Sequence, residues 1–379
     1  MDQSEIEKQS AFELQPMLTC LGNKRKLVKN ISDLIDTIAT RIGKPSSQLN
    51  LMDAFTGSGV VSRMMFNKSA TLITNDMENY SYLMSKCFFD VPSVYQQKSI
   101  QEHIQHMNHI AIYGPFIQDG IISSLYAPAN TTNIQEGERC FYTHENAVII
   151  DTLRDYIEKM VEPENRVYCL VPLLIKASIN ANTAGVFKGF YKKGTVGHFG
   201  GAGENALSRI MKPIYLDVPI WSSSGTKHIA FHADVNSIPS ETLKQYDLDI
   251  IYLDPPYNQH PYGSNYFMLN VIASNVKPEK ISKVSGIPVD WNKSNYNTRS
   301  NAVAAMTDLL DKCLNHGVAK YVILSYNNEG IINVDDWEKI FEPYLVEKHE
   351  IKYDAYKGSR NLKDRANKVI EIMYIIHKM

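Results

Sequence analysis

The chain has 379 residues, which exceeds one small module and favours two or three domains of about 100–200 residues each. Its hydrophobic share of 44% and charged share of 21%, with 20 glycines and 16 prolines, exclude a disordered, collagen-like or fibrous protein. The net charge of −2 is small, so composition alone does not indicate a polyanionic partner such as nucleic acid.

The first 90 residues alternate between helix and strand patterns. Residues 1–16 are polar and predict a loose arm, whereas apolar positions over 27–38 recur every three or four residues and predict an amphipathic helix. The apolar run 49–55 predicts a strand that leads through a glycine turn into a helix, and 70–76 predicts a second strand followed by a helix over 78–89. Two strand–helix units in succession indicate a parallel α/β sheet.

The alternation stops between about residues 90 and 228. This stretch combines helical patches, several prolines and seven glycines between Gly185 and Gly203, and it predicts an inserted domain that is mainly helical and rich in loops. The expected fold is therefore α/β, with a sheet of about seven strands formed by 1–89 and 229–379 around an insert at 90–228. Strand patterns return at 228–233, 247–253, 320–326, 344–354 and 368–377, and the last two are expected to pair antiparallel.

A glycine turn, Phe-Thr-Gly-Ser-Gly at 55–59, follows the first predicted strand and opens a helix. Nucleoside cofactors bind beyond such strand ends in doubly wound sheets, where glycines let the backbone approach the ligand. Ser62 stands where a dinucleotide-binding turn has its third glycine. Asp76 ends the next strand, where a carboxylate can accept two hydrogen bonds from a ribose diol. The pair predicts an adenosine-type cofactor; an ordinary tight turn and a helix-capping aspartate are the alternatives.

A second turn, Asp-Pro-Pro-Tyr at 254–257, directly follows the apolar run ending at residue 253. The exocyclic amine of a base is a weak nucleophile, because its lone pair is delocalised into the ring. Acceptance of its two N–H bonds by the Asp254 carboxylate and the Pro255 carbonyl would localise that pair. Prolines have a fixed φ and no N–H, and Tyr257 offers a face on which a base can stack. The turn predicts methyl transfer from a sulfonium to a base amine, and a strand-terminating turn is the alternative.

Together the motifs resemble one family. The segments LGNKRKL (21–27), AFTGSG (54–59), DPPYN (254–258) and LSYNNEG (324–330), with Asp76, are similar in kind and order to the Dam-like, alpha-class DNA adenine-N6 methyltransferases, including those of restriction-modification systems. The resemblance covers about two thirds of the chain. It implies a Rossmann-like class I methyltransferase sheet, S-adenosyl-L-methionine as cofactor and a flipped-out adenine in duplex DNA as substrate.

The resemblance also implies roles for individual residues and segments. The insert would be the target-recognition domain, and the two flanking segments the catalytic domain. Aspartate before Pro-Pro favours adenine N6 over cytosine N4. Within the cofactor set, Gly22 to Lys24 would meet the methionine end, Asp76 the ribose and Asp234 the adenine, although a cap or turn role is the alternative for Asp234. The implied catalytic residues are Asp254, Pro255, Pro256 and Tyr257, and the implied cofactor-binding residues are Leu21, Gly22, Asn23, Lys24, Asp53, Phe55, Gly57, Ser58, Gly59, Asp76, Asp234 and Tyr266.

Local basic clusters predict DNA contacts despite the small net charge. Phosphate contacts supply affinity that depends on salt but not on base sequence, so other side chains must read the bases. The segment 188–205 is the leading candidate, because its glycines suit a mobile loop and its aromatic residues could fill the space left by a flipped base. A plain surface loop with packed aromatics is the alternative. The expected DNA-binding residues are Lys26, Lys188, Tyr191, Lys192, Lys193, Asn258, Lys357 and Arg360.

Other features define the expected setting of the protein. Five scattered cysteines and isolated histidines, none at ligand spacing, predict neither a disulfide framework nor a metal site. The polar start, and the lack of an apolar run near the roughly 20 residues of a membrane span, predict a cytoplasmic protein, here of a prokaryote or phage. The expected partners are double-stranded DNA and a cognate restriction endonuclease acting at the same site, and the expected state is a monomer or weak dimer.

Two other functions stay open from the sequence. A methyltransferase acting on RNA or on another amino group can share the Asp-Pro-Pro-Tyr type of turn, and a catalytically silent DNA-binding subunit can keep the fold. The opening segment 21–27 and an insert of about 140 residues favour the DNA enzyme over the first alternative. Intact Asp254 and Tyr257 count against the second.

Overall fold

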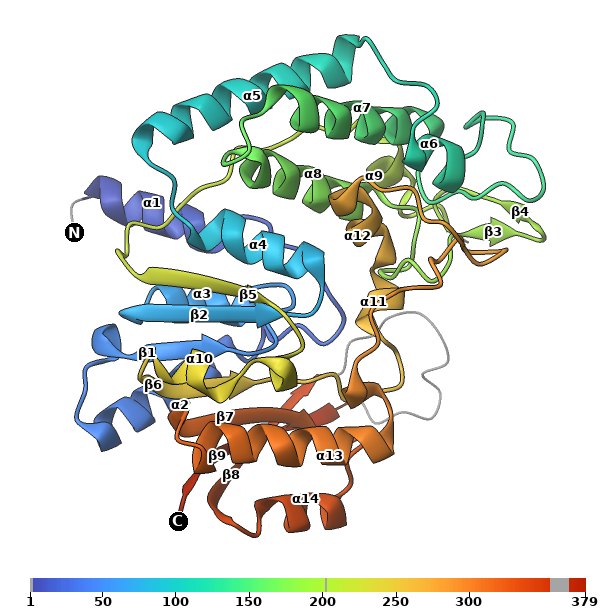
Figure 1. The fold of residues 1–379 in the computed structure, drawn as a ribbon. Coiled ribbons are helices and arrows are strands. Elements are labelled where there is room, and N and C mark those ends of the chain that lie inside the picture. Colours follow the sequence, from blue (N-terminus) through green and yellow to red (C-terminus); the bar gives the residue numbers. More distant parts are fainter. Residues whose placement is uncertain (1–2, 202, 355–367) are drawn as a thin grey trace. The chain divides into compact units, whose positions relative to one another are not determined.

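The computed structural model describes residues 3–201, 203–354 and 368–379 (Figure 1). Contacts divide the chain into two compact units, which are described separately. Unit 1 comprises Met1–Leu21, Lys86–Trp221 and Tyr262–Trp291, and unit 2 comprises Gly22–Ser85, Ser222–Pro261 and Asn292–Met379.

Within the described residues, unit 2 contains a seven-stranded sheet in the order β5-β2-β1-β6-β7-β9-β8 (Figure 1). Neighbours from β5 to β7 are parallel, and β9 is antiparallel to both β7 and β8. The predicted α/β sheet and its antiparallel closing pair are confirmed. The strands are β1 (Asn50–Asp53), β2 (Thr71–Asp76), β5 (Lys227–His232), β6 (Leu248–Leu253), β7 (Ala319–Asn327), β8 (Tyr344–Asp354) and β9 (Lys368–Lys378).

Helices cover the sheet because its central strands are apolar on both faces. β6 is buried at every position, as expected for a strand in the middle of a parallel sheet. α13 (Arg299–Leu310) and α14 (Val334–Phe341) contribute Met306 and Trp337 to a core shared with β1, β6 and β7. The amphipathic helix predicted over 27–38 is confirmed as α2 (Val28–Ile42), which ends at the left-handed Gly43. Unit 2 also holds α3 (Val60–Phe66) and α10 (Ser240–Lys244), and α4 (Asn79–Phe89) crosses the boundary between the units.

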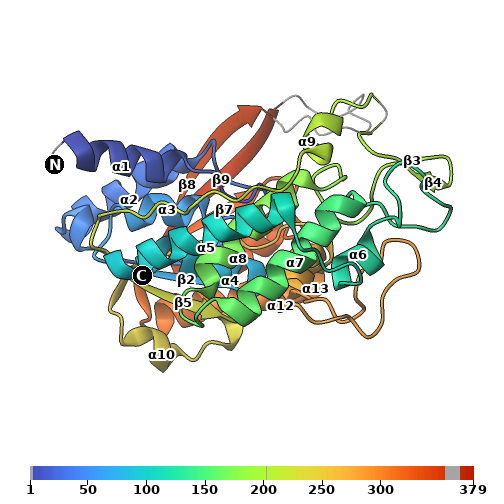
Figure 2. The ribbon, with the colours of Figure 1, turned by 90° about the horizontal axis from the view of Figure 1, so that it is seen from above.

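Unit 1 is mainly helical and rich in loops, as predicted for the insert. Its long helices α5, α7 and α8 lie side by side (Figure 2). A short antiparallel pair, β3 with β4, projects from the loop region. The elements are α1 (Gln3–Leu14), α5 (Val94–Tyr113), α6 (Ile121–Tyr126), α7 (His144–Met160), α8 (Arg166–Asn180), β3 (Lys192–Lys193), β4 (Val196–Gly197), α9 (Leu207–Met211), α11 (Tyr262–Asn265) and α12 (Phe267–Ser274).

Unit 1 differs from the expected insert 90–228 because it also takes in the amino terminus and residues 262–291. The loose arm expected over 1–16 is wrong: α1 buries Phe12 completely, and the Gln15 side chain donates to the Ile220 carbonyl at 2.7 Å. The Arg139 guanidinium donates to three consecutive carbonyls of residues 282–284. These long-range contacts have no counterpart in local sequence patterns.

Each of the five cysteines lies in the described part of the chain, and each is buried and outside any disulfide bond. Across the described residues, no helix combines the length and apolarity required to cross a membrane.

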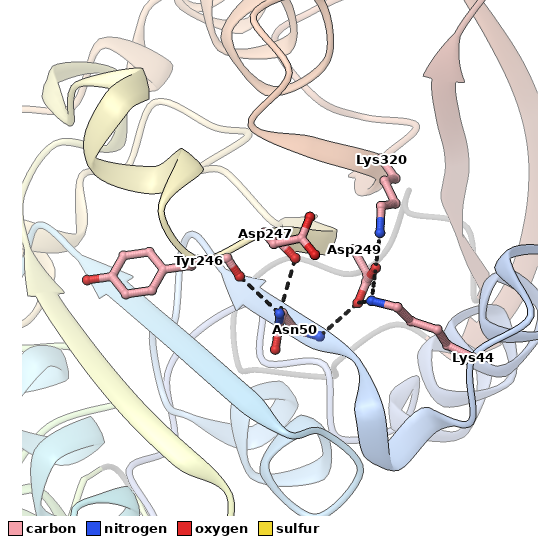
Figure 3. Close-up of polar contacts among 6 residues, drawn as sticks. All are labelled: Lys44, Asn50, Tyr246, Asp247, Asp249 and Lys320. Atoms are coloured by element: carbon pink, nitrogen blue, oxygen red, sulfur yellow. Dashed lines mark hydrogen bonds and ion pairs between the residues drawn. The ribbon is translucent and has the colours of Figure 1, made fainter.

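A buried carboxylate joins three strands at their amino ends (Figure 3). The Asp249 side chain in β6 is fully buried, and it accepts hydrogen bonds from Lys44 Nζ at 2.9 and 3.0 Å and from Lys320 Nζ at 2.7 Å. The Asn50 backbone N–H at the start of β1 donates to the same carboxylate at 3.0 Å. Burial opposes ionisation, but these donors outweigh it, so the pKa of Asp249 lies below its ordinary value.

We expect Asp249→Asn to lower the free energy of unfolding by about 1.5–3 kcal/mol at pH 7, the range for hydrogen bonds to a charged group. Because the folded-state pKa is depressed, this contribution is complete above the unfolded-state pKa of about 3.9 and is lost as the pH falls through the folded-state value. Urea unfolding between pH 7 and pH 3 measures the effect, with the exposed Asp33→Asn as control. A difference from wild type that stays constant with pH would contradict this account.

Candidate active site

The motifs predicted in unit 2 converge at one edge of its sheet. Asp53 is the last residue of β1, Asp76 is the last residue of β2, and Asp254 directly follows β6. Because β1 pairs in parallel with both β2 and β6, these three strand ends are neighbours. The glycine turn and the Asp-Pro-Pro-Tyr turn therefore lie side by side in the position where doubly wound sheets bind ligands.

The glycine turn is anchored to the end of β2. Gly57 and Gly59 have φ angles of +54° and +77°, a region that glycine adopts without steric cost. The Gly57 N–H donates to Asp76 Oδ2 at 2.7 Å, and the Glu78 N–H donates to Asp76 Oδ1 at 2.8 Å. Burial raises the pKa of Asp76 although both amides favour its charged form. An ionised carboxylate has about four acceptor sites, so Asp76 keeps capacity for further donors.

Asp53 carries a buried oxygen without a hydrogen-bond partner. Its Oδ2 accepts a hydrogen bond from Ser62 Oγ at 2.5 Å, whereas Oδ1 accepts none from the described residues. Burial raises the pKa of Asp53 to about 7, opposed by the Ser62 hydroxyl. Ser62 thus orients this carboxylate from the position where a dinucleotide-binding turn has glycine. A buried unpaired acceptor is costly, and Oδ1 is therefore open to a further donor.

Lys24 lies against the Asp-Pro-Pro-Tyr turn. Its Nζ is 2.8 Å from Asp254 Oδ1, 3.2 Å from Glu371 Oε1 and 3.2 Å from the Gly22 carbonyl, and it lies 5.5 Å from the centre of the Tyr257 ring. An ammonium has three N–H donors, which matches these three oxygens. Burial disfavours the cation, but the carboxylates of Asp254 and Glu371 outweigh it and raise the pKa of Lys24 well above its ordinary value.

Asp254 is half-buried, and its two oxygens differ. Oδ1 accepts from Lys24, whereas Oδ2 accepts no hydrogen bond from the residues that the structure describes. Burial raises the pKa of Asp254 to about 6; Lys24 opposes this shift, and the like charge of Glu371 adds to it. The site thus holds a carboxylate that is ionised at neutral pH with one oxygen left as an acceptor.

The remainder of the turn is held from both sides. The Tyr257 ring makes an edge contact with Tyr326, with ring centres 6.2 Å apart, and the Ile331 N–H donates to the Tyr257 carbonyl at 3.0 Å. Asn297 Nδ2 donates to the Asn258 carbonyl at 2.8 Å. These contacts fix the backbone on which the Asp254 and Tyr257 side chains are displayed.

An aromatic pair connects the glycine turn to the segment that follows β5. Phe55 contacts Tyr296 edge-on at 5.3 Å, and the Tyr296 hydroxyl donates to Asn236 Oδ1 at 2.7 Å. Asp234 accepts from the Asn236 N–H at 3.0 Å and caps the short helix 235–237. The capping alternative for Asp234 is therefore observed, and its contact with a cofactor adenine stays a prediction.

Two predicted cofactor residues belong to unit 1. The Leu21 N–H donates to the Tyr266 hydroxyl at 2.7 Å, and the Leu21 carbonyl accepts from the Tyr262 hydroxyl at 2.6 Å. Tyr266 is fully buried, as its helical apolar pattern indicates. The other predicted cofactor and catalytic residues belong to unit 2.

The predicted DNA-binding residues are distributed over several places. Lys188, Lys192 and Lys193 are exposed in unit 1, and Tyr191 is half-buried. Lys26 is exposed and Asn258 is half-buried in unit 2. In the glycine-rich segment, Phe187 and Phe199 are buried, so for these two rings the packed alternative is correct. Lys357 and Arg360 lie outside the described residues.

Three residues of the candidate site were not predicted from the sequence: Glu371, Tyr296 and Asn297. Glu371 could have been noticed, because it is the one acidic residue inside the apolar run 369–376. An isolated acid in a buried strand requires a partner, although the pattern does not say which. Tyr296 and Asn297 follow a polar loop and carry no comparable signal. The described residues contain no group of three or more histidine, cysteine or acidic side chains that could hold a metal ion.

Comparison with known proteins identifies the family. Residues 21–340 match the sequence model of the D12 class N6 adenine-specific DNA methyltransferases. The chain is 27% identical over 370 residues to the type II methyltransferase M.NlaIII of Neisseria lactamica, which covers 94% of this chain and 98% of that protein.

Two further relatives extend the comparison. The modification methylase StsI of Streptococcus sanguinis is 28% identical over 376 residues; the match covers 94% of this chain but 51% of that longer protein. The type II methyltransferase M.CviAII of Paramecium bursaria Chlorella virus 1 is 28% identical over 300 residues, which cover 77% of this chain and 79% of that protein. Since the family match spans most of the chain and includes both turns at the sheet edge, the chain belongs to the D12 class N6 adenine-specific DNA methyltransferases.

Proposed function

We propose that unit 2 transfers a methyl group from S-adenosyl-L-methionine to the N6 of a flipped-out adenine, with Asp254, Pro255, Pro256 and Tyr257 as the catalytic residues. The observation that carries this proposal is Asp254 itself: it lies at the end of β6 beside the glycine turn, ionised at neutral pH, with Oδ2 left as an acceptor. Asp254 and the Pro255 carbonyl accept the two N–H bonds of the amine, and Tyr257 stacks on the base.

The described residues fit the proposed cofactor. S-Adenosyl-L-methionine supplies an electrophilic methyl group on a sulfonium, together with an ammonium and a ribose diol. Asp53 Oδ1, buried and without a partner, suits a cationic donor, and Asp76 keeps acceptor capacity for the diol. The half-buried Phe55, which packs edge-on against the buried Tyr296, offers apolar surface near Asp234 for the adenine ring. The other proposed cofactor contacts are Leu21, Gly22, Asn23, Lys24, Gly57, Ser58, Gly59 and Tyr266.

The proposed reaction is a direct displacement. The N6 lone pair, localised by Asp254 and Pro255, forms a bond to the methyl carbon. The bound cofactor would supply this methyl group from its sulfonium, and the electron pair of the broken carbon–sulfur bond would stay on sulfur as a thioether. N6 then loses one proton to water, so the products are N6-methyladenine and S-adenosylhomocysteine.

We also propose that unit 1 selects the DNA target and that the enzyme is the modification partner of a restriction endonuclease acting at the same site. The relatives support this context by their names, which are type II methyltransferases and modification methylases. Lys192 and Lys193 form β3 and Lys188 precedes them; all three are exposed and suit contacts with DNA phosphates. The proposed location is the cytoplasm of a prokaryote or of a cell that carries a phage; the bacterial and viral sources of the relatives support it.

A transfer assay tests the function directly. The protein is incubated with methyl-labelled S-adenosyl-L-methionine and with unmethylated duplex DNA, RNA or a protein mixture, and methylated positions are then mapped on the DNA. We expect label on duplex DNA at adenine N6 within one short sequence. Label confined to RNA or protein, or no label on any substrate, would overturn the proposal.

Asp76→Ala should weaken the affinity for S-adenosyl-L-methionine by about 10- to 100-fold, because hydrogen bonds to a charged group contribute about 1.5–3 kcal/mol. Isothermal titration calorimetry measures the dissociation constant, with the exposed Asp33→Ala as control. A cofactor analogue without the ribose 2′-hydroxyl separates direct contact from a disturbed turn: it should bind wild type weakly and lose little more in the variant. Equal additional losses for both ligands would contradict the ribose contact.

A further inference from the structure

Glu371 is a fully buried carboxylate on β9, two residues from the fully buried Met373, and it lies within the apolar run 369–376 of that strand. Its Oε1 accepts a hydrogen bond from Ser325 Oγ of β7 at 2.6 Å and lies 3.2 Å from Lys24 Nζ. A buried acid costs stability unless it is paired. The pairing with Lys24 meets this requirement, and it connects β9 to the Asp-Pro-Pro-Tyr turn through one cation.

Glu371 changes the charge balance of the site. If Lys24 contacted Asp254 alone, cation and anion would cancel, and the lysine would reduce the strength of Asp254 as a hydrogen-bond acceptor. Lys24 is instead shared between two carboxylates at 2.8 and 3.2 Å. Counted at their ordinary charges, one lysine and two carboxylates carry a net charge of −1 beside the proposed acceptor oxygen of Asp254.

We propose that Glu371 is a positioning residue for methyl transfer, which holds Lys24 between two carboxylates so that Asp254 keeps its strength as the acceptor for the base amine. This inference deepens the proposed function and rests on the catalytic role of Asp254. Glu371 acts through Lys24, while Ser325 fixes the carboxylate from the neighbouring strand.

The proposal predicts a change in the titration of Asp254. The charged and titratable groups facing Asp254 are Lys24 before α2, Glu371 on β9, Asp53 at the end of β1, and the two tyrosines Tyr252 and Tyr257. In Glu371→Gln the like charge is gone and Lys24 pairs with Asp254 alone. Both changes favour the ionised form of Asp254, so the pH below which transfer fails should move down.

Single-turnover methyl transfer on duplex DNA, followed from pH 5 to pH 9 in the full-length protein, tests this. Glu371→Gln preserves the size of the side chain and its acceptor for the Ser325 hydroxyl. We expect the transfer rate of this variant at pH 8 to fall about tenfold. The pH at which its rate is half-maximal on the acidic side should move about one unit lower, within the range for a charge at this distance. Cofactor affinity should stay within twofold. Glu371→Asp keeps the charge and should recover part of the rate, and the exposed Glu350→Gln on β8 is the matched control.

Two outcomes would overturn the proposal. One is a wild-type rate and midpoint in Glu371→Gln. The other is a rate loss with an unchanged midpoint and a parallel loss of stability in urea, which would assign Glu371 to the fold alone. Asp254→Asn in the same assay distinguishes failure of the proposed function from failure of the inference about Glu371. If Asp254→Asn keeps the wild-type rate, the proposed catalytic role of Asp254 fails. If Asp254→Asn is inactive while Glu371→Gln behaves as wild type, only the inference about Glu371 fails.

Discussion

Asp254→Asn should reduce methyl transfer by about 10²–10³-fold and leave the affinity for S-adenosyl-L-methionine within twofold. The change replaces a charged acceptor with a weaker amide, and loss of one well-placed polar group at a reacting centre has about this effect. The cofactor site should persist, because its proposed acidic contacts, Asp53 and Asp76, belong to β1 and β2. Single-turnover kinetics and calorimetry measure the two quantities.

The pH dependence of the same reaction provides an independent check. Burial raises the pKa of Asp254 to about 6, and the protonated acid presents a donor in place of an acceptor. The wild-type rate should therefore be maximal above pH 7 and fall as the pH drops through about 6. The exposed Asp33→Asn should follow the wild-type profile. Loss of cofactor binding in Asp254→Asn, or a wild-type rate in that variant, would contradict the assigned role.

Lys24→Met should lower the free energy of unfolding by about 3–5 kcal/mol at pH 8, the cost of removing one partner of a buried ion pair. The variant leaves Asp254 and Glu371 close together without a counter-ion, and both side chains are largely buried. Proton uptake by these carboxylates relieves the cost, so the difference from wild type should shrink as the pH falls to about 5.5.

Urea unfolding at pH 8 and pH 5.5 measures this difference. Lys29→Met is the matched control, because Lys29 lies on α2 with an exposed side chain and pairs with an exposed Asp33. That variant should leave the stability close to that of the wild type at either pH, because exposed ion pairs contribute little. An equal loss for Lys24→Met at both pH values would show that unpaired charge is not the cause.

Local patterns were sufficient to predict the sheet. The segments that form β1, β2, β6 and β7 are apolar because parallel strands are covered on both faces. This need for apolar residues on both faces produces a continuous apolar run that is visible in the sequence. The Asp-Pro-Pro-Tyr and glycine turns were equally readable, because each directly follows such a strand. Their side-by-side placement follows from the parallel pairing of β1 with its neighbours.

Other features depend on contacts between distant segments. The helix α1 has a polar sequence, yet its Phe12 is fully buried, and Gln15 just after it pairs with Ile220, some 200 residues away. Residues 262–291 join unit 1 through Arg139, which no spacing rule connects to that loop. Sequence periodicity reports which face of an element is buried, but not which partner buries it.

The sheet, the glycine turn, the Asp-Pro-Pro-Tyr turn and the family resemblance could be predicted from the sequence, because each depends on residues adjacent in the chain. The tertiary structure alone decided the electrostatics of the site. Lys24, expected at the methionine end of the cofactor, lies between Asp254 and Glu371, which are 117 residues apart. Charge interactions depend on distance through space and on exclusion of water, and the fold sets both only when β6 and β9 come together around β7.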